Sequence, residues 1–161
     1  MKRKDWLILS HLRKNARSTL TQISRKTYIP VTTVYDHLRK YEQKLIMKNA
    51  CLLDFKKIGF KSKAKIAVRV DNNQRDFVKN LIEHPLVNSL YRLSADFDAN
   101  FDFMIELIAR EQRDIDNFIR DLKRDFPVSN SLIFNVTEDL KREEFLSDSE
   151  GERIQPYLQT V

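Results

Sequence analysis

The stretch 19–44 has the pattern of a helix-turn-helix, and this pattern constrains the fold of the chain more than any other feature. Thr19 and Gln22 have the spacing of a capping box, in which each side chain binds a backbone N–H at a helix start. The short helix that they open is expected to end near Thr27, with a turn at residues 28–30. A longer helix follows, and the sequence therefore predicts two helices joined by a tight turn.

The second of these helices is amphipathic. Apolar side chains recur at helical spacing along one stripe, namely Val34, Leu38, Tyr41 and Leu45. At about 100° per residue, the opposite face collects polar and basic side chains: Thr32, Asp36, Arg39, Lys40 and Gln43. A helix with such a face is what a protein needs to contact base edges in the major groove of DNA.

We therefore predict that the chain binds double-stranded DNA. Arg39 has the geometry for a bidentate bond to guanine, whereas Lys40 is expected at a phosphate. For any single residue, a solvated helix surface is the alternative interpretation. The full set of predicted DNA contacts is Arg17, Thr32, Thr33, Tyr35, Asp36, His37, Arg39, Lys40, Lys56 and Lys57.

The distribution of charge supports a polyanionic partner for one end of the chain. Up to Lys65 there are 17 Lys/Arg and 4 Asp/Glu, a net charge of +13, and the remainder has 12 and 19, a net charge of −7. The basic part coincides with the predicted helix-turn-helix, so a solvated lysine-rich surface is the weaker explanation.

Several classes of protein are disfavoured by composition. Cys51 is the single cysteine among 161 residues, which rules out an intrachain disulfide and fits a cytoplasmic protein. No apolar run approaches the roughly 20 residues of a membrane span. Only Gly59 and Gly151 are glycines, so a glycine-rich phosphate loop is absent, and we expect no cofactor and no metal.

The remaining sequence predicts an α+β chain. Trp6, Leu9 and Leu12 mark a first helix that packs on the helix-turn-helix, and apolar residues at 45–54 predict an extended strand after it. From residue 65 onward, apolar alternation and helical spacing predict strands and helices in the order β-α-β-β-α-β, the split ferredoxin-like arrangement. The helices would cover one face of the sheet and leave the other free to pair with a second copy.

These patterns divide the chain into four parts. Residues 1–53 form a winged helix-turn-helix domain, 54–64 a lysine-rich linker, 65–137 the ferredoxin-like domain, and 138–161 a polar tail. For the tail, a short helix docked on the domain is the alternative.

A winged helix-turn-helix followed by a basic linker and a β-α-β-β-α-β module resembles the Lrp/AsnC family of prokaryotic transcription regulators. The most specific stretches are Asn15-Ala16-Arg17, residues 34–42 and Ile46-Met47. The resemblance implies a homodimer formed through the sheet, assembly into octamers, and an amino-acid effector. The chain departs from the family at Tyr28, Pro30 and Leu45, where the family has Gly, a Ser cap and Gly.

The family's effector loop carries a Gly-x-x-Asp element, and two copies with Ala in place of Gly occur here. The resemblance places effector contacts at Ala95, Asp96 and Asp98 in one copy, and at Ala99, Asn100 and Asp102 in the other. Ala resists the positive φ that Gly allows. Acids of a surface loop beside buried phenylalanines are therefore the alternative interpretation.

A catalytic role has little support in the sequence, and we expect the chain not to be an enzyme. His11, His37 and His84 lie on different elements without metal-ligand spacing. One alternative is a siroheme-decarboxylase-like enzyme, since proteins of that kind share the two-module architecture, with His84 as the residue to test. His84 as a helix cap before Pro85 is the simpler interpretation. A protein that compacts DNA without sequence preference is a further alternative.

Overall fold

The chain folds into two units, and each is described by itself. The computed structural model describes residues 2–94 and 100–147. Unit 1 comprises Met1–Leu52 and Leu140–Val161, and unit 2 comprises Leu53–Asp139. The chain therefore passes from one unit to the other twice.

Unit 1 contains three helices, α1 (Arg3–Lys14), α2 (Leu20–Thr27) and α3 (Val31–Lys44). Its core is formed by Ile8, Ile23, Val34 and Tyr41, with Leu9, Leu12, Leu20, Ile29 and Ile46 packed around them. The expected stripe of α3 is confirmed at Val34 and Tyr41, whereas Leu45 is half exposed.

The first helix exists as predicted, and Leu9 and Leu12 pack against the core of unit 1. The core residue of α1 that is fully buried is Ile8, which the predicted spacing did not include. The helix carries apolar residues on several sides (residues 6–9 are all apolar), so spacing alone did not identify its most buried residue.

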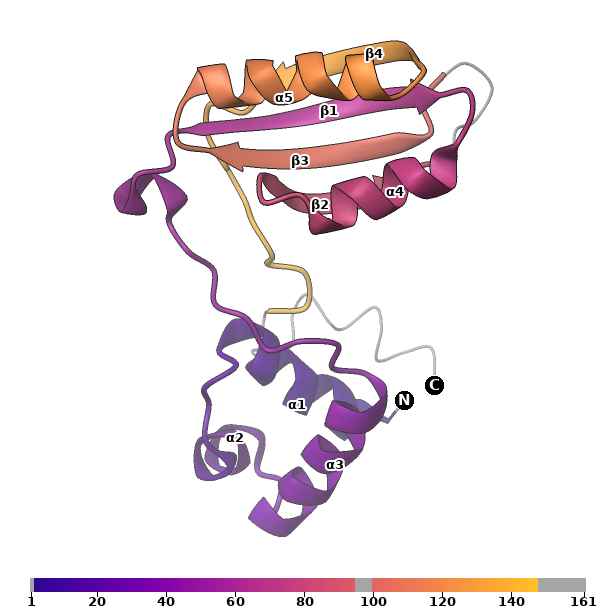
Figure 1. Ribbon diagram of the computed structural model, residues 1–161. Helices are drawn as coiled ribbons and strands as arrows, with labels where there is room; N and C mark the ends of the chain where they lie inside the picture. The colour runs from indigo at the N-terminus through magenta and orange to yellow at the C-terminus, as the bar shows by residue number, and fades with distance from the viewer. Residues whose placement is uncertain (1, 95–99, 148–161) are drawn as a thin grey trace. The chain divides into compact units, whose positions relative to one another are not determined.

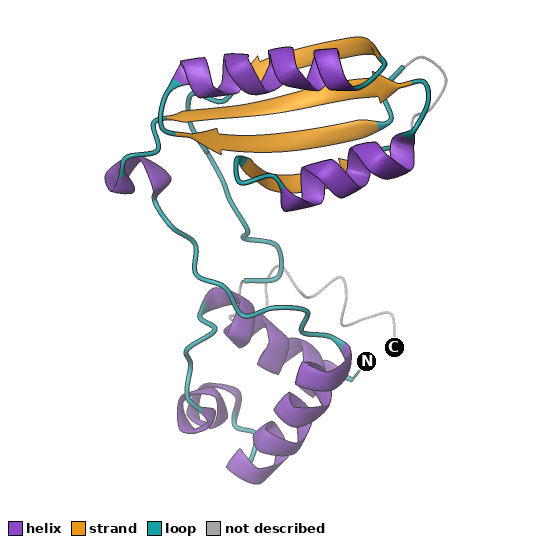
Figure 2. Cartoon of the chain, viewed as in Figure 1, coloured by secondary structure: helices purple, strands orange, loops and turns teal. Residues whose placement is uncertain are grey.

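The predicted strand at 45–54 is wrong. These residues are irregular, and Figure 2 shows only helices and loops in the described part of unit 1. A β-strand needs a hydrogen-bonded neighbour, and residues 2–52 with 140–147 contain no second strand. The apolar character of this segment is therefore not a sign of sheet pairing within the unit.

Residues 54–64, predicted to be a linker, belong to unit 2 and are structured. A 3₁₀ helix, η1 (Phe55–Ile58), begins where the Asp54 side chain accepts a hydrogen bond from Lys57 N, and ends at Gly59 with φ of 97°. Glycine adopts this φ without the steric penalty of a Cβ atom. Strand β1 (Ser62–Val70) starts three residues later.

The order β-α-β-β-α-β is confirmed in unit 2. Strand β1 is followed by α4 (Gln74–Glu83), β2 (Val87–Arg92), β3 (Phe103–Ala109), α5 (Gln112–Asp125) and β4 (Val128–Asn135). The sheet is antiparallel, with strand order β2-β3-β1-β4. Both helices cover the same face of the sheet (Figure 1).

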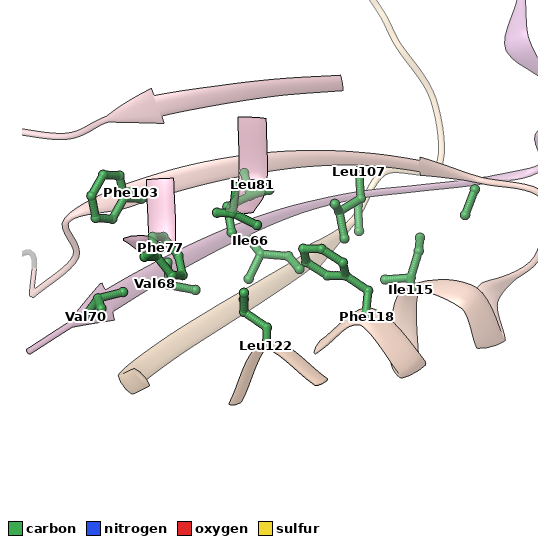
Figure 3. Packing of buried hydrophobic residues seen from close by; sticks show 13 residues of the cluster. Ile66, Val68, Val70, Phe77, Leu81, Phe103, Leu107, Ile115, Phe118 and Leu122 are labelled. Carbon is green, nitrogen blue, oxygen red and sulfur yellow. The ribbon is translucent and has the colours of Figure 1, made fainter. Parts of the chain in front are cut away.

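The core of unit 2 lies between the sheet and these helices (Figure 3). Phe77 of α4 packs on Phe103 of β3, with ring centroids 5.1 Å apart, and α5 contributes Ile115, Phe118 and Leu122. On β1, Ala64, Ile66, Val68 and Val70 face this layer. Residues of opposite parity, such as Ala67 and Lys65, therefore lie on the sheet face away from the helices.

Candidate DNA-binding surface

The helix-turn-helix is held by the capping box that the sequence predicts. Gln22 N donates to Thr19 Oγ1 at 3.2 Å, and Thr19 N donates to Gln22 Oε1 at 2.9 Å. Helix α2 ends at Tyr28 in the left-handed conformation, with φ of 58°. A left-handed conformation costs a residue with a Cβ atom roughly 1–2 kcal/mol, so the exposed Tyr28 occupies a position that favours glycine.

Helix α3 presents the predicted polar face to solvent. Thr32, Tyr35, Asp36, Arg39, Lys40 and Gln43 are all exposed, and Thr33 is half buried. Arg39 and Lys40 form no ion pair with any residue in 2–94 or 100–147. Their positive charges are therefore available for base edges and phosphates.

Three polar side chains connect the first helix to the recognition helix. Asp5 Oδ1 on α1 lies 2.7 Å from His37 Nδ1 and accepts a hydrogen bond of 2.6 Å from the Tyr41 hydroxyl, both on α3. His37 Nδ1 and the Tyr41 hydroxyl are 2.9 Å apart. His37 is only 17% exposed and faces α1, whereas the sequence placed it among the DNA contacts.

The charge of Asp5 is stabilised in this cluster. Burial by itself raises the pKa of Asp5, but hydrogen bonds from Tyr41 and Lys2 N, with the charge of His37, hold it below its usual value. Burial and the bond to Asp5 raise the pKa of the Tyr41 phenol. The cluster thus sets the position of α3 on α1 through an ionised carboxylate with several donors.

The other predicted contacts lie outside α3. Arg17 is exposed in the loop between α1 and α2, where its backbone N–H is bound by Asn15 Oδ1. Lys56 and Lys57 belong to unit 2. Lys56 Nζ donates to Thr137 O at 2.8 Å, and Lys57 Nζ lies 3.4 Å from Asp54 Oδ2. The sequence did not indicate either partner.

Stability of unit 1 is expected to fall in mild acid because of His11. Burial, together with the charges of Lys26 and Lys14, holds the pKa of His11 below its usual value. The unfolded chain binds a proton there below about pH 6.5, whereas the folded unit does not. Unfolding then takes up a proton, so stability should be constant above this pH and should decrease below it.

Urea unfolding at several pH values, followed by fluorescence of Trp6, measures this dependence in unit 1, because Trp6 is the single tryptophan. The variant His11→Gln should lose the part of the slope that falls below about pH 6.5. An identical slope in both proteins would assign the effect to other groups.

Only part of the predicted effector loop lies within the described residues. Ala95, Asp96, Asp98 and Ala99 lie outside them. Asn100 is exposed. The Asp102 Oδ2 atom accepts a 2.8 Å hydrogen bond from Val70 N at the end of β1. This carboxylate oxygen is therefore already bound within unit 2.

A polar cluster on the sheet was not predicted. Lys63 Nζ lies 3.0 Å from Glu106 Oε1 and 2.8 Å from Asp139 Oδ1, and Glu106 also accepts from Asn88 and Ser89. Burial raises the pKa of Glu106, but these donors hold it below its usual value. The partners lie tens of residues apart, and no local pattern in the sequence connects them.

The structure offers little for catalysis at His84. This residue caps the end of α4, as the simpler interpretation predicted, and its Nδ1 accepts a hydrogen bond from Leu86 N at 3.2 Å. The ring packs edge-on against Phe118. Within residues 2–94 and 100–147, no three His, Cys, Asp or Glu side chains are grouped as metal ligands. No helix of that part has the length and apolarity to cross a membrane.

The chain is similar to known DNA-binding and regulatory proteins. A family model described as winged helix-turn-helix DNA-binding matches residues 1–44. The glutamate uptake regulatory protein of Zymomonas mobilis is 28% identical over 114 residues, which cover 68% of this chain and 70% of that protein. Its name describes a regulator, in agreement with the prediction from α3.

Solved structures show the same fold. A transcriptional regulator of Neisseria meningitidis, in complex with L-Met, matches with a TM-score of 0.78 and 19% identity, over 88% of this chain and 93% of that one. An AsnC family transcriptional regulator from Agrobacterium tumefaciens matches with a TM-score of 0.76 and 20% identity, over 88% and 94%. At this identity the likeness establishes the two-module architecture.

Proposed function

We propose that this chain is a transcription regulator of the Lrp/AsnC type that binds a pseudo-palindromic DNA site as a homodimer inside the cell. The exposed Arg39 and Lys40 on α3 carry the proposal, because they lie on a polar helix face of the kind that enters a major groove and form no ion pair within residues 2–94 and 100–147. Two copies related by a two-fold axis would place half-sites about one helical turn, or a multiple of it, apart.

The free face of the sheet supports dimer formation. The register pairs Leu132 with Ala67 and Phe134 with Lys65, which places both apolar side chains on the face away from the helices. Leu132 and Phe134 are 46% and 48% exposed. Tyr91 of β2 lies on the same face and is 55% exposed. Burial of such a patch against its copy stabilises a dimer.

The proposal includes two further features of the family. Dimers would assemble further, up to octamers, and an amino acid would act as effector. The L-Met complex of the Neisseria meningitidis regulator supports an amino-acid ligand. The relatives are regulators, and we infer that this chain likewise has no catalytic activity.

The substitution Arg39→Ala tests the DNA surface. Loss of a bidentate contact is expected to weaken binding to the preferred site by about 1–3 kcal/mol, which is roughly 5- to 150-fold, and to relax preference at one base position. Selection of bound fragments from genomic DNA, at several salt concentrations, measures both quantities. An unchanged affinity and motif would remove α3 from the interface.

Lys44→Ala is the matched control, because Lys44 is an exposed cation at the end of the same helix. It is expected to lower affinity for all sequences alike through loss of charge, without a change in motif. If the unmodified protein retained DNA fragments without enriching any sequence motif, an architectural role would be supported instead.

A further inference from the structure

Unit 1 has a groove whose lining includes none of the predicted DNA contacts. It has a volume of about 480 Å³ and a mainly apolar lining. Helix α1 contributes Trp6, Leu9 and Leu12. The segment after α3 forms the opposite side with Leu45, Ile46 and Met47, of which Met47 is fully exposed. This α1 groove leaves apolar surface that water solvates poorly.

The C-terminal part of the chain already reaches this groove. Arg13, which lines it, donates to Glu143 O at 3.0 Å and to Phe145 O at 3.2 Å. The same guanidinium lies 3.1 Å from the Glu143 carboxylate. Leu146 then lies in the lining of the groove itself, two residues before the last fourteen residues of the chain begin.

Those fourteen residues have the chemistry that the groove requires. The sequence of residues 148–161 has its apolar side chains in its second half: Ile154, Tyr157, Leu158 and Val161. The stretch that leads to them is acidic, with Glu143, Glu144, Asp148, Glu150 and Glu152. Arg13 and Lys48 line the groove and complement that charge.

We propose that residues 148–161 of this chain dock in the α1 groove, with Tyr157 and Leu158 against Trp6, Leu9 and Leu12. The Arg13 contacts hold the chain at the mouth of the groove, so docking costs little further loss of chain entropy. The C-terminal segment then forms part of the DNA-binding unit. Docking of this segment involves no DNA, no effector and no second copy. The experiment that tests it is therefore independent of the proposed regulatory function.

Trp6 reports occupancy of the groove directly, because it lines the groove and is the single tryptophan of the chain. In the full chain we expect Trp6 emission at short wavelength and weak quenching by acrylamide. A chain that ends at Ser147 should show a red-shifted emission and a severalfold larger quenching constant. A synthetic peptide of residues 148–161, added to the truncated chain, should reverse both changes with saturation.

A full-length variant avoids the objection that truncation disturbs folding. The double variant Tyr157→Ser/Leu158→Ser should reproduce the Trp6 spectrum of the truncated chain. The control Gln159→Ser/Thr160→Ser, which also replaces two adjacent residues but removes no apolar side chain, should leave Trp6 protected. Circular dichroism verifies that helix content is equal in all proteins. Protection of Trp6 that is unaltered by truncation and by Tyr157→Ser/Leu158→Ser would overturn the proposal.

Protein concentration separates the intrachain occupant from a second copy. With the segment docked in its own chain, quenching of Trp6 in the full-length protein is independent of concentration. Protection that disappears on dilution would overturn the proposal in favour of a groove covered by another molecule.

Discussion

The double substitution Leu132→Asp, Phe134→Asp is expected to convert the protein to a monomer. Both side chains are about half exposed on the free sheet face. In the proposed dimer Leu132→Asp would place a carboxylate against apolar surface, which costs several kcal/mol, and Phe134→Asp, opposite Lys65, would remove apolar area, so the dimer should weaken at least ~100-fold. Sedimentation velocity over a range of concentrations measures the change.

The matched control is Ile133→Asp on the same strand. Ile133 is 40% exposed but pairs with Ile66, so it lies on the helix-covered side of the sheet. This variant should remain dimeric at concentrations where the double variant is monomeric. Dimers in both would place the interface elsewhere. The monomer is also expected to bind a palindromic site with the low affinity of one half-site.

The second large effect is expected from Asp5→Ala. This carboxylate accepts bonds from Tyr41 and Lys2 N and lies beside His37, with a side chain only 13% exposed. Removing it leaves two polar groups of α3 without their partner and removes an α1 capping bond. Unit 1 should lose about 3 kcal/mol of unfolding free energy, measured by urea unfolding with Trp6 fluorescence.

The effect of Asp5 should depend on pH in a defined direction. Its pKa is lower in the folded unit than in the unfolded chain, so its contribution is full above about pH 4 and is lost as pH falls through the folded value. Glu42→Ala, an exposed acid on the same helix as Tyr41, is the control and should change stability by less than about 0.5 kcal/mol. Equal losses in both variants would mean that the cluster has no special role.

Local rules predicted much of this protein. The capping box at Thr19, the stop before Pro85 and the order of strands and helices in unit 2 depend on residues close in sequence. The stripe of α3 followed from helical spacing, and its outer face is exposed as expected. Such features could be predicted because backbone hydrogen bonding and amphipathicity act over a few residues.

The remainder depends on contacts between distant residues. Asp5 and Tyr41 are 36 positions apart. No local pattern therefore indicated that His37, predicted as a DNA contact, instead faces Asp5 of α1. Lys56 was predicted to contact DNA, but its ammonium group donates to Thr137 O, 81 positions away in the sequence. The apolar residues after α3 indicated a strand, although residues 2–52 and 140–147 contain no strand that could pair with one.

The contact of Arg13 with Glu143 joins residues 130 positions apart, so it can form only late in synthesis. The helices of unit 1 and the strands of unit 2 both leave the ribosome before residues 140–147 do. If the proposed dimer forms through the sheet, a product that stops after β4 would lack the Arg13 contact but keep the dimer interface. Such a product should join intact chains and act as a dominant inhibitor.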